Sequence, residues 1–351
     1  MAVTGSTVQE TFKNMQALLS RVVPEAELRI KAELVYEINQ LKKQKDAIIL
    51  GHNYMEPALF HTVPDHVGDS LGLSRIAATT NASTIIFCGV RFMAETAKIL
   101  NPDKTVLLPA KEAGCSLAAS ITAQDIRDLR LLYPGVPIVT YINTYADVKA
   151  EVDICCTSGN AVKVVESLPD QQIIFVPDEY LAKNIAQETG KKIVVASRDI
   201  SGVLKVNDPD RADMIGWHGR CEVHEKFKVE DIENIRAQFP EVEVIAHPEC
   251  SPEVVGASDY SGSTTGLVKY VKDSKKKTFL ILTECAMGDN IIAENPDKEI
   301  VRMCNIRCPH MNQITLEDTL RALTHNEQVI ELDEGIRERA YKSVQRMLEI
   351  H

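Results

Sequence analysis

An internal triplication limits the folds open to this chain of 351 residues. Three short apolar runs each end in polar residues, a pattern typical of buried strands: AIILGHNY (47–54), PIVTYINT (137–144) and VEVIAHPE (242–249). A hydroxyl-rich turn that opens a helical pattern follows each run, in VGDSLGLS (67–74), CTSGNAVK (156–163) and SGSTTGLV (261–268). Because the same features occur three times in the same order, we predict three homologous α/β units.

Each repeat continues with a second apolar run, a helical segment and a third apolar run. The second runs are TIIFCGV (84–90), QIIFVPD (172–178) and TFLILTE (278–284). The third runs are KTVLLP (104–109), KKIVVAS (191–197) and KEIVRM (298–303). The tetrapeptide NPDK leads into the third run of the first and last repeats, at 101–104 and 295–298. The middle repeat is longer, and we place its insertion near residues 198–216.

The alternation of strands and helices predicts the fold class. Strand–helix–strand order is typical of parallel sheets that carry helices on both faces. Ligands of such sheets bind beyond the carboxyl ends of the strands, where helix amino ends also point. The polar clusters of all three repeats lie at these ends. We therefore predict an α/β protein of three homologous α/β/α units with parallel sheets around a pseudo-threefold axis and an active site at the central junction.

The triplication also predicts the domain organisation. The repeats divide the chain into unit 1 at 46–130, unit 2 at 131–235 and unit 3 at 236–320. An N-terminal helical segment (1–45) and a C-terminal helical segment (321–351) flank them. The first carries an amphipathic pattern interrupted by Pro24, and the second contains the amphipathic run DEGIRERAYKSVQRMLE.

Charge and cysteine usage narrow the class of protein. The chain has 39 Lys and Arg against 50 Asp and Glu, a net charge of −11, which argues against binding to nucleic acid or anionic lipid. No apolar stretch is long enough to span a membrane, and the first residues lack the pattern of a signal peptide. We expect a cytoplasmic, reducing compartment, in which the nine cysteines stay free or bind metal.

Common fingerprints of catalysis are absent from the sequence. It has no Walker A motif and no GxGxxG, so it gives no support to nucleotide binding. A GxSxG elbow, an HExxH pair and a CxxC pair are also missing, which disfavours a serine hydrolase, a zinc protease and a zinc ribbon.

One cysteine in a polar turn closes each repeat: Cys115, Cys221 and Cys308. Thiolate sites select zinc or iron–sulfur clusters. Three cysteines on a four-iron cluster would leave one iron open to act as a Lewis acid on substrate oxygen. Position alone leaves the alternative of three unrelated free thiols open, and the triplication favours metal binding.

Polar residues near the strand ends are candidates for acid–base work and anion binding. His52, His247 and Glu249 could move protons, and His224 could be a metal ligand or support one. The alternative for each histidine is a structural hydrogen bond. A second set has the position of helix N-caps, a geometry that also binds carboxylate or phosphate: Ser70, Ser158, Ser263 and Thr264.

At this point the motifs resemble those of the quinolinate synthases, the iron–sulfur enzymes of NAD biosynthesis. The resemblance covers roughly residues 47–320 and rests on GHNYMEP, VGDSLGLS, GVRFMAETAKILNPDKTVLLP, AGCSLA, YINTYADVKAEVDICCTSGNA, FVPDEYLAKNIA, HPECSPEV, SGSTTGL and CPHMNQITLE. It implies a condensation of iminoaspartate (iminosuccinate) with dihydroxyacetone phosphate to quinolinate, phosphate and water. It also implies a [4Fe–4S] cluster and a functional link to an enzyme that produces iminoaspartate.

The resemblance also assigns roles to residues of this chain. It implies that Cys115, Cys221 and Cys308 hold the cluster and that Tyr54, His52 and Glu249 are catalytic. The residues that it implies for substrate binding are His52, Ser70, Tyr141, Asn143, Ser158, His247, Glu249 and Thr264. One departure concerns the C-terminal cysteines. Some relatives carry CxxCxxC, whereas this chain has Cys304 and Cys308, and we choose Cys308 because it directly precedes Pro309.

Other functions remain open on the sequence alone. The same open iron would suit an aconitase-like hydro-lyase of a small dicarboxylate. An iron–sulfur sensor or electron carrier is a non-catalytic alternative, although a carrier would favour four protein ligands and a closed cluster. A zinc site is a further alternative.

Overall fold

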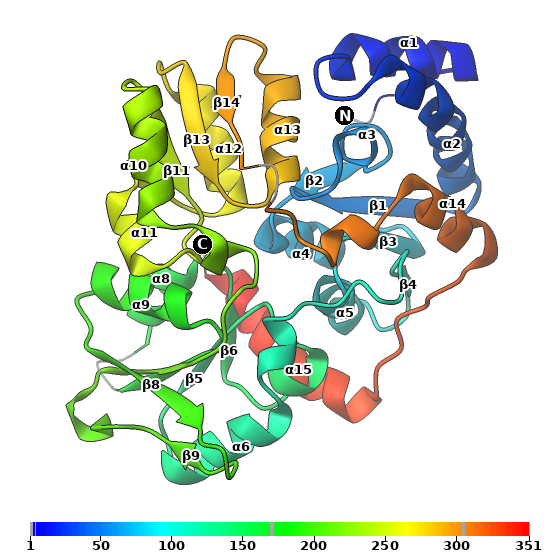
Figure 1. Ribbon diagram of the computed structural model, residues 1–351. Coiled ribbons are helices and arrows are strands. Elements are labelled where there is room, and N and C mark those ends of the chain that lie inside the picture. The colour runs from blue at the N-terminus through cyan, green and yellow to red at the C-terminus, as the bar shows by residue number, and fades with distance from the viewer. Residues whose placement is uncertain (1–2, 4, 169–171, 304–305, 351) are drawn as a thin grey trace.

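Three separate β-sheets form the framework of the residues that the structure, a computed structural model, describes: 3, 5–168, 172–303 and 306–350. Each sheet and its helices form one lobe, and the three lobes meet at the centre of the molecule (Figure 1). Every strand pair is parallel except β8 with β9. The predicted α/β class is confirmed, whereas the domain boundaries stay a prediction.

Unit 1, the blue-to-cyan lobe of Figure 1, has strand order β2-β1-β3-β4. Its elements are β1 (Ala47–His52), α3 (Pro57–Phe60), β2 (His66–Gly68), α4 (Ser70–Thr79), β3 (Thr84–Cys88), α5 (Arg91–Leu100), β4 (Thr105–Leu107) and the 3-10 helix η1 (Ala118–Ser120).

Unit 3, in yellow and orange, repeats this order as β12-β11-β13-β14. The helix α10 (Val229–Gln238), which crosses the predicted boundary between units 2 and 3, leads into this sheet. The elements that follow are β11 (Glu243–Ala246), α11 (Pro252–Ala257), β12 (Tyr260–Ser261), α12 (Thr264–Asp273), β13 (Thr278–Leu282), α13 (Cys285–Glu294), β14 (Glu299–Val301) and η4 (Met311–Gln313). The short second strands β2 and β12 lie in segments for which the sequence predicts only a turn.

Unit 2, in green, has the order β6-β5-β7-β10-β8-β9. The helix α6 (Ala123–Leu132), which crosses the predicted boundary between units 1 and 2, leads into this sheet. The elements that follow are β5 (Ile138–Tyr141), α7 (Ala146–Lys149), β6 (Ile154–Cys156), α8 (Ala161–Glu166), β7 (Ile173–Val176), α9 (Glu179–Glu188), β8 (Ile193–Arg198), β9 (Leu204–Lys205), η2 (Pro209–Arg211), β10 (Met214–Trp217) and η3 (His224–Lys226).

The strand predicted at 191–197 is confirmed as β8, but its predicted correspondence to the third strands of the other units is wrong. The run KKIVVAS contains β8, but β10 takes the place beside β7 that β4 and β14 occupy beside β3 and β13. The inserted element is therefore β8 with β9, which extends the sheet at its outer margin. Both runs are short and apolar, so local pattern could not decide which of them pairs with β7.

One pattern of aspartate contacts, repeated in all three units, holds the strands β1, β5 and β11 in place. An aspartate accepts a hydrogen bond from a strand N–H through its Oδ2 atom, at 2.9 Å for Asp65, 2.8 Å for Asp153 and 2.8 Å for Asp259. Each aspartate also pairs with a base on the helix before the strand: Lys42 at 2.8 Å, Arg130 at 3.0 Å and Arg236 at 2.9 Å. Repetition of this contact supports a common origin of the three units.

The NPDK repeat also has one structural role in both of its copies. The side chain of Lys104 donates to the carbonyl oxygen of Thr80, the C-cap of α4. The side chain of Lys298 donates to the carbonyl oxygen of Ser274, the C-cap of α12. The tetrapeptide thus ties the third strand to a helix of the same unit.

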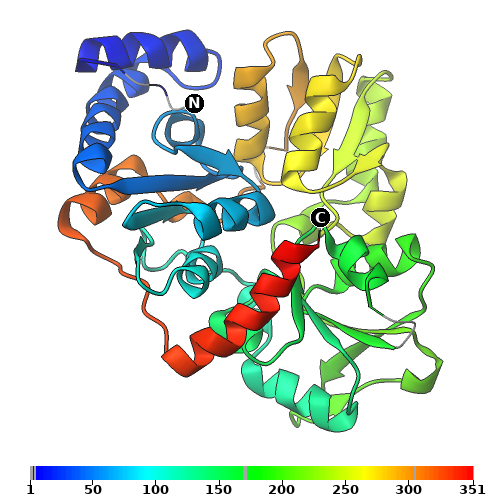
Figure 2. The same ribbon diagram turned by 180° about the vertical axis from the view of Figure 1, so that it is seen from behind.

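Helices from both ends of the described chain cover the units. The N-terminal pattern forms α1 (Val8–Leu19) and α2 (Glu25–Gln44), with Pro24 as the N-cap of α2. After unit 3 come α14 (Leu316–His325), which packs on α2, and α15 (Glu334–Glu349). Figure 2 shows α15 in red crossing from unit 1 to unit 2 on the back of the molecule, where it packs against α5, α7 and β6. None of the described helices is both long and apolar enough to cross a membrane.

The expected helix caps are partly wrong. Ser263 is the N-cap of α12, and its hydroxyl accepts from the N–H of Gly266. In α4, Asp69 is the N-cap and Ser70 is the first helical residue, because a carboxylate is an equally good acceptor and its charge opposes the helix dipole. Thr264 likewise is the first residue of α12, and Ser158 precedes Asn160, the N-cap of α8.

Candidate functional site

Three cysteine turns of one geometry face the centre of the molecule. The carbonyl oxygen of each cysteine accepts a hydrogen bond from the N–H group four residues later, at 3.0 Å for Cys115, 3.0 Å for Cys221 and 3.1 Å for Cys308. A 3-10 helix begins three residues after each cysteine, as η1, η3 and η4. The three turns are therefore structural equivalents from three units.

A backbone hydrogen bond joins each cysteine turn to a helix of the same unit. These helices are α5, which follows β3, α9, which follows β7, and α13, which follows β13. The first residue of each helix donates its N–H to the carbonyl oxygen two residues before the cysteine. The pairs are Arg91 to Ala113 at 2.7 Å, Glu179 to Gly219 at 2.7 Å and Cys285 to Ile306 at 3.2 Å. Cys308 is thus the counterpart of Cys115 and Cys221, whereas Cys304 lies outside the described residues.

The sulfur atoms of these turns receive hydrogen bonds in the same way. The backbone N–H groups two and three residues further along donate to each sulfur: Leu117 and Ala118, Val223 and His224, His310 and Met311. Burial nevertheless raises the pKa of the Cys115 thiol to about 12 and that of Cys308 to about 11. A bound cation would favour the thiolates, and the backbone donors would stabilise their charge.

Exposure separates these cysteines from the others. Eight free cysteines lie in the described residues. Cys115, Cys221 and Cys308 are partly exposed, and the remaining ones are buried: Cys88, Cys155, Cys156, Cys250 and Cys285. The buried thiols pack as small apolar side chains.

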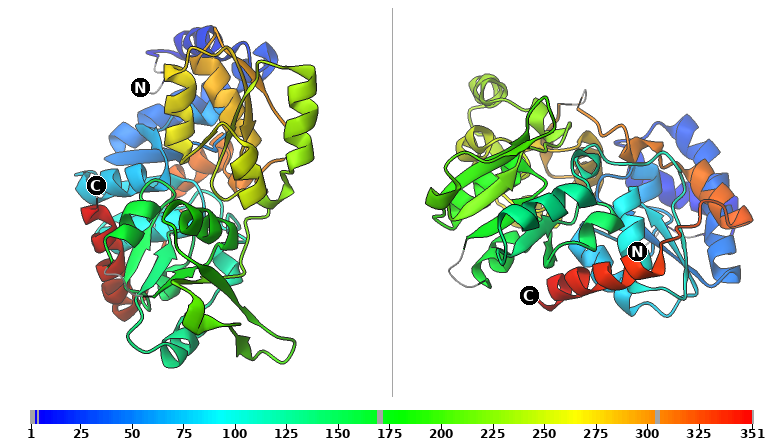
Figure 3. Two further views of the ribbon diagram at one scale, coloured as in Figure 1. Left: turned by 90° about the vertical axis from the view of Figure 1, so that its left-hand side faces the viewer. Right: turned by 90° about the horizontal axis from the view of Figure 1, so that it is seen from below.

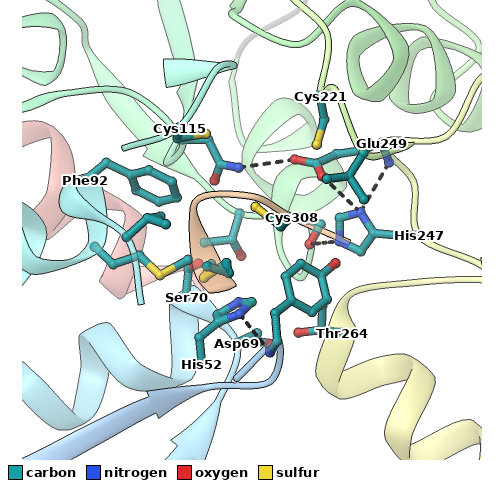
Figure 4. Close-up of a pocket in the computed structure, with 18 of the residues that line it drawn as sticks. His52, Asp69, Ser70, Phe92, Cys115, Cys221, His247, Glu249, Thr264 and Cys308 are labelled. Carbon is teal, nitrogen blue, oxygen red and sulfur yellow. Dashed lines mark hydrogen bonds and ion pairs between the residues drawn. The ribbon is translucent and has the colours of Figure 1, made fainter. Parts of the chain in front are cut away.

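A cavity of about 70 Å³ lies where the three lobes meet, and every residue that the family resemblance assigns to the site lines it, whereas Ser263, a candidate for anion binding, does not. Figure 4 shows the sulfur atoms of the three cysteines around one space, with His52, Ser70 and Thr264 on the far side of it from Cys221. The predicted lining residues are His52, Tyr54, Ser70, Cys115, Tyr141, Asn143, Ser158, Cys221, His247, Glu249, Thr264 and Cys308. Their roles are not tested by this placement.

Several other lining residues were not singled out for the site. The apolar residues among them are Val90, Phe92, Met93, Val223 and Met311. Two further polar residues line the cavity: Asp69, which precedes Ser70, and Thr157, which precedes Ser158. His224 also lines the cavity, and its only signal in the sequence was its place three residues after Cys221.

Glu249 is the charged centre of the cavity. Its side chain is buried, with His224 Nδ1 2.7 Å from Oε2 and the Asn143 side-chain amide donating to Oε1 at 3.2 Å. Burial by itself raises the pKa of Glu249, but His224, His247 and the Tyr141 hydroxyl outweigh it and bring the pKa below its ordinary value. We expect an ionised carboxylate at neutral pH.

His52 and His247 occupy similar places at the carboxyl ends of their strands: His52 is the last residue of β1, and His247 directly follows β11. The Nδ1 atom of each ring accepts from the backbone N–H two residues later, at 3.2 Å from Tyr54 and 3.3 Å from Glu249. In a neutral ring, this bond leaves the proton on Nε2. Burial lowers the pKa of His52 to about 4 and that of His247 to about 3. Both rings are therefore neutral N–H donors at neutral pH.

The tyrosines of the cavity hold their protons. Burial raises the pKa of Tyr54 and of Tyr141 well above the ordinary value, and the nearby Glu249 raises both further. The cavity thus combines the carboxyl groups of Glu249 and Asp69 with neutral donors, and the donors suit anionic ligands next to a bound cation.

One further group of donors could hold a metal ion. Among the described residues, Cys221, His224 and Glu249 place one ligand atom each within 4.8 Å of the others. In this structure they bind each other instead, since His224 Nδ1 lies 3.2 Å from the Cys221 sulfur as well as 2.7 Å from Glu249. Cys221 belongs both to this group and to the three cysteine turns.

Comparison with known proteins agrees with the geometry. Residues 36–349 match the family described as NadA, Quinolinate synthetase A protein. The chain belongs to the quinolinate synthase family. It is 48% identical over 343 residues to quinolinate synthase 1 of Mesorhizobium japonicum, an alignment that covers 98% of this chain and 99% of the relative.

Other members of the family are equally similar. The quinolinate synthase of Agrobacterium fabrum is 48% identical, with 98% of this chain and 94% of the relative covered. That of Xylella fastidiosa is 50% identical over 313 residues, 89% of this chain and 86% of the relative. The resemblance that the sequence motifs indicate is therefore confirmed, and it extends into the N-terminal helices.

Proposed function

We propose that this chain is a quinolinate synthase, an enzyme of NAD biosynthesis that condenses iminoaspartate with dihydroxyacetone phosphate to quinolinate, phosphate and water. The observation that carries the proposal is the convergence of three equivalent cysteine turns and the motif residues of the family on one cavity. The comparisons give no support to an aconitase-like hydro-lyase.

A [4Fe–4S] cluster held by Cys115, Cys221 and Cys308 fits the donor set. The three partly exposed thiols come from equivalent turns, and each has two backbone N–H donors of the kind that stabilise cluster sulfurs. Three protein ligands leave one iron free to supply a Lewis acid for substrate oxygens. The Cys221, His224 and Glu249 group would suit zinc instead, and metal analysis separates the two sites.

Neutral donors bind the anionic substrates in this proposal. The Nε2–H groups of His52 and His247 can donate to carboxylates without adding charge. Ser70 and Thr264 are the first residues of α4 and α12, so the positive ends of two ten-residue helices face the same cavity. These groups explain how a chain of net charge −11 can hold two anions.

Glu249 and Tyr54 are suited to complementary proton transfers. The ionised carboxylate of Glu249 can take a proton from a substrate carbon or nitrogen, and the protonated Tyr54 can give one to a developing oxyanion. Asn143 holds one oxygen of Glu249 in place. His52 supports Tyr54 through its bond to the Tyr54 backbone N–H.

The proposed function has consequences for location and partners. Its substrates are small metabolites, and the free thiols of the described residues fit a reducing, cytoplasmic compartment. An enzyme that makes iminoaspartate would have to supply the first substrate, which gives a functional link and requires no stable complex.

Anaerobically purified protein tests the proposal. We expect iron and sulfide in equal amounts, a visible cluster absorption, and quinolinate formation from iminoaspartate and dihydroxyacetone phosphate. A cluster-loaded protein that forms no quinolinate would overturn the proposal. A hydro-lyase would dehydrate a hydroxy acid without the triose phosphate, and a zinc protein would be colourless.

A further inference from the structure

Two asparagines of different units occupy the same place in equivalent helices. Asn184 is the sixth residue of α9 in unit 2, and Asn290 is the sixth residue of α13 in unit 3. The first residue of each of these helices makes the same backbone bond to its cysteine turn. The register of the two helices therefore agrees, and the asparagines are structural equivalents.

The side chain of Asn184 holds the backbone around Glu249 in the next unit. Its Nδ2 atom donates to the carbonyl oxygen of Pro248 at 2.8 Å and to that of Cys250 at 2.9 Å. An amide nitrogen carries two hydrogens, one for each carbonyl. The peptide groups on both sides of Glu249 are thus tied to a helix of unit 2.

Asn290 holds the backbone around Tyr54 in the same way. Its Nδ2 atom donates to the carbonyl oxygen of Asn53 at 3.2 Å and to that of Met55 at 2.9 Å. Its side chain is buried, so water does not replace these bonds readily. A helix of unit 3 therefore fixes the place of Tyr54 in unit 1.

The two segments that the asparagines hold also agree in their own bonds. Each begins with a histidine, His52 or His247, whose Nδ1 atom accepts from the N–H of Tyr54 or Glu249. The carbonyl oxygen of each histidine accepts from the N–H three residues later, at 3.0 Å and 2.9 Å. Each proton-transfer residue is thus held by a histidine of its own unit and by an asparagine of the neighbouring one.

Among the described residues, the junction of α5 with unit 2 has no counterpart of this contact. The sixth residue of α5 is Thr96, whose hydroxyl donates to the carbonyl oxygen of Phe92 in the same helix at 2.8 Å. The register of the strand pairs puts Asn143 where the other units have Tyr54 and Glu249, and an amide does not titrate. The contact therefore occurs at the two junctions that carry a proton-transfer group.

We propose that Asn184 and Asn290 are positioning residues of the active site, each of which fixes a proton-transfer group of the next unit. Asn184 sets the place of Glu249. Asn290 does the same for Tyr54. This role deepens the proposed function and rests on it, and it makes the distance between the two groups depend on how the three units meet.

Leucine at either position removes both hydrogen bonds at nearly constant side-chain size. Asn184→Leu and Asn290→Leu each leave two carbonyl oxygens without their donor. Serine at the same positions is too short to reach both carbonyls and leaves room for water, so it gives a second pair of variants if the leucine proteins do not fold. Thr96→Val is the matched control, because Thr96 is buried at the same helix position and bonds only within α5.

Steady-state kinetics of the cluster-loaded variants test the proposal. We expect kcat to fall about 10- to 100-fold in each asparagine variant, since displacement of a reactive group by about 1 Å can cost this much. KM should change little, and Thr96→Val should keep its activity. An unchanged kcat in either asparagine variant would overturn the proposal.

Double variants separate positioning from a general loosening of the units. In Tyr54→Phe, we expect Asn290→Leu to have little further effect on kcat, because the residue that it positions can no longer transfer a proton. Asn184→Leu should keep its full effect there. Glu249→Gln should give the reverse result. Equal further losses in both backgrounds would overturn the proposal, since the asparagines would then only hold the units together.

Hydrogen–deuterium exchange of the backbone amides gives a readout that does not depend on turnover. We expect Asn184→Leu to speed exchange in residues 247–250 and to leave residues 52–55 unchanged, and Asn290→Leu to do the reverse. Unchanged exchange in both segments would overturn the proposal even in an active enzyme. Failure of the wild type to form quinolinate would instead contradict the proposed function and leave the exchange pattern to decide which segment each asparagine holds.

Discussion

Unit 2 agrees with units 1 and 3 at the cavity and differs from them at its outer margin. At the cavity it offers the same cysteine turn, with the same bonds before and after the cysteine. At the outer margin β8 and β9 extend its sheet beyond β10, and this segment projects away from the other lobes in Figures 1 and 3. Here Ile200 and Val203 are exposed to solvent.

This difference shows where a triplicated fold is free to vary. The cavity needs a contribution from every unit, so each copy keeps its cysteine turn. None of the residues of the insertion lines the cavity, and Arg198 joins the insertion to α6 through Asp125 and Asp128. The repeated contacts should therefore be sensitive to substitution, and the insertion should be tolerant.

The largest effect is expected at the cysteine turns. Cys115→Ala, Cys221→Ala and Cys308→Ala should each lower iron content and reduce turnover by more than about 100-fold, because each removes a cluster ligand. Iron analysis, the visible spectrum and quinolinate formation measure the effect.

Two other cysteines serve as controls for these variants. Cys88→Ala removes a buried thiol outside the cavity and should keep both iron and activity. Cys304→Ala should keep both as well. Loss of the cluster in Cys304→Ala, together with its retention in Cys308→Ala, would show that the third ligand is misassigned.

A contact between units 1 and 3 that is remote from the cysteine turns should give a pH-dependent effect. Burial lowers the pKa of His61 to about 4, and Glu294 of α13 lies 3.8 Å from its ring. The unfolded chain, with an ordinary pKa near 6.5, binds a proton before the folded protein does. The contribution of His61 to stability is complete above this value and is lost as pH falls toward 4.

Urea unfolding at pH 8 and pH 5 measures this contribution. We expect the pH change to lower the unfolding free energy of the wild type by about 2 kcal/mol more than that of His61→Gln, from the shift in pKa. The comparison uses the difference between the two pH values, so a general loss of stability in the variant does not affect it. The same pH dependence in both proteins would contradict the burial argument.

A smaller effect is expected from the aspartates that fasten the first strands. Asp65→Ala, Asp153→Ala and Asp259→Ala should each reduce the unfolding free energy by about 1–3 kcal/mol, because each leaves a strand N–H without its acceptor. The three losses should be similar despite the longer sheet of unit 2. A much smaller loss for Asp153→Ala in urea unfolding would mean that the insertion stabilises the whole unit.

The smallest effect is expected at the insertion. Ile200→Ala should change stability by less than about 0.5 kcal/mol and leave quinolinate formation unchanged, because the side chain is fully exposed. Ile215→Ala, on the buried strand β10, is the matched control and should cost about 2–5 kcal/mol. An activity loss in the first variant would give the insertion a role in the site.

The sequence predicts the fold well where a pattern is repeated and local. The NPDK copies mark equivalent places, and Lys104 and Lys298 make equivalent bonds. The order of strands in unit 2 could not be predicted in this way. The pairing of β7 with β10 joins segments that the insertion separates, and non-local pairing leaves no trace in the pattern of a single strand.

The candidate site was predictable for a related reason. Parallel strands end at one edge, so His52 and His247 were expected beside the cavity from their places in two repeats. The contact between the Tyr54 hydroxyl and Thr283 was not predictable, since the two residues come from different units. The cysteine turns were predictable in part. The sequence places one cysteine in a polar turn of each unit, but the backbone hydrogen bonds that make Cys308 equivalent to Cys115 and Cys221 are visible only in the structure.

The path of α15 implies an order of events during synthesis. Ser343 of this helix donates to the carbonyl oxygen of Lys149 at 2.7 Å, and Arg337 donates to that of Ile99 at 3.5 Å. Domains generally fold as they leave the ribosome, the N-terminal ones first. Units 1 and 2 contact each other directly, since the Ala146 N–H donates to Glu95, and α15, which is made after all three sheets, adds the contacts across the back. The residues that line the cavity are therefore all made before the helix that ties units 1 and 2 together across the back.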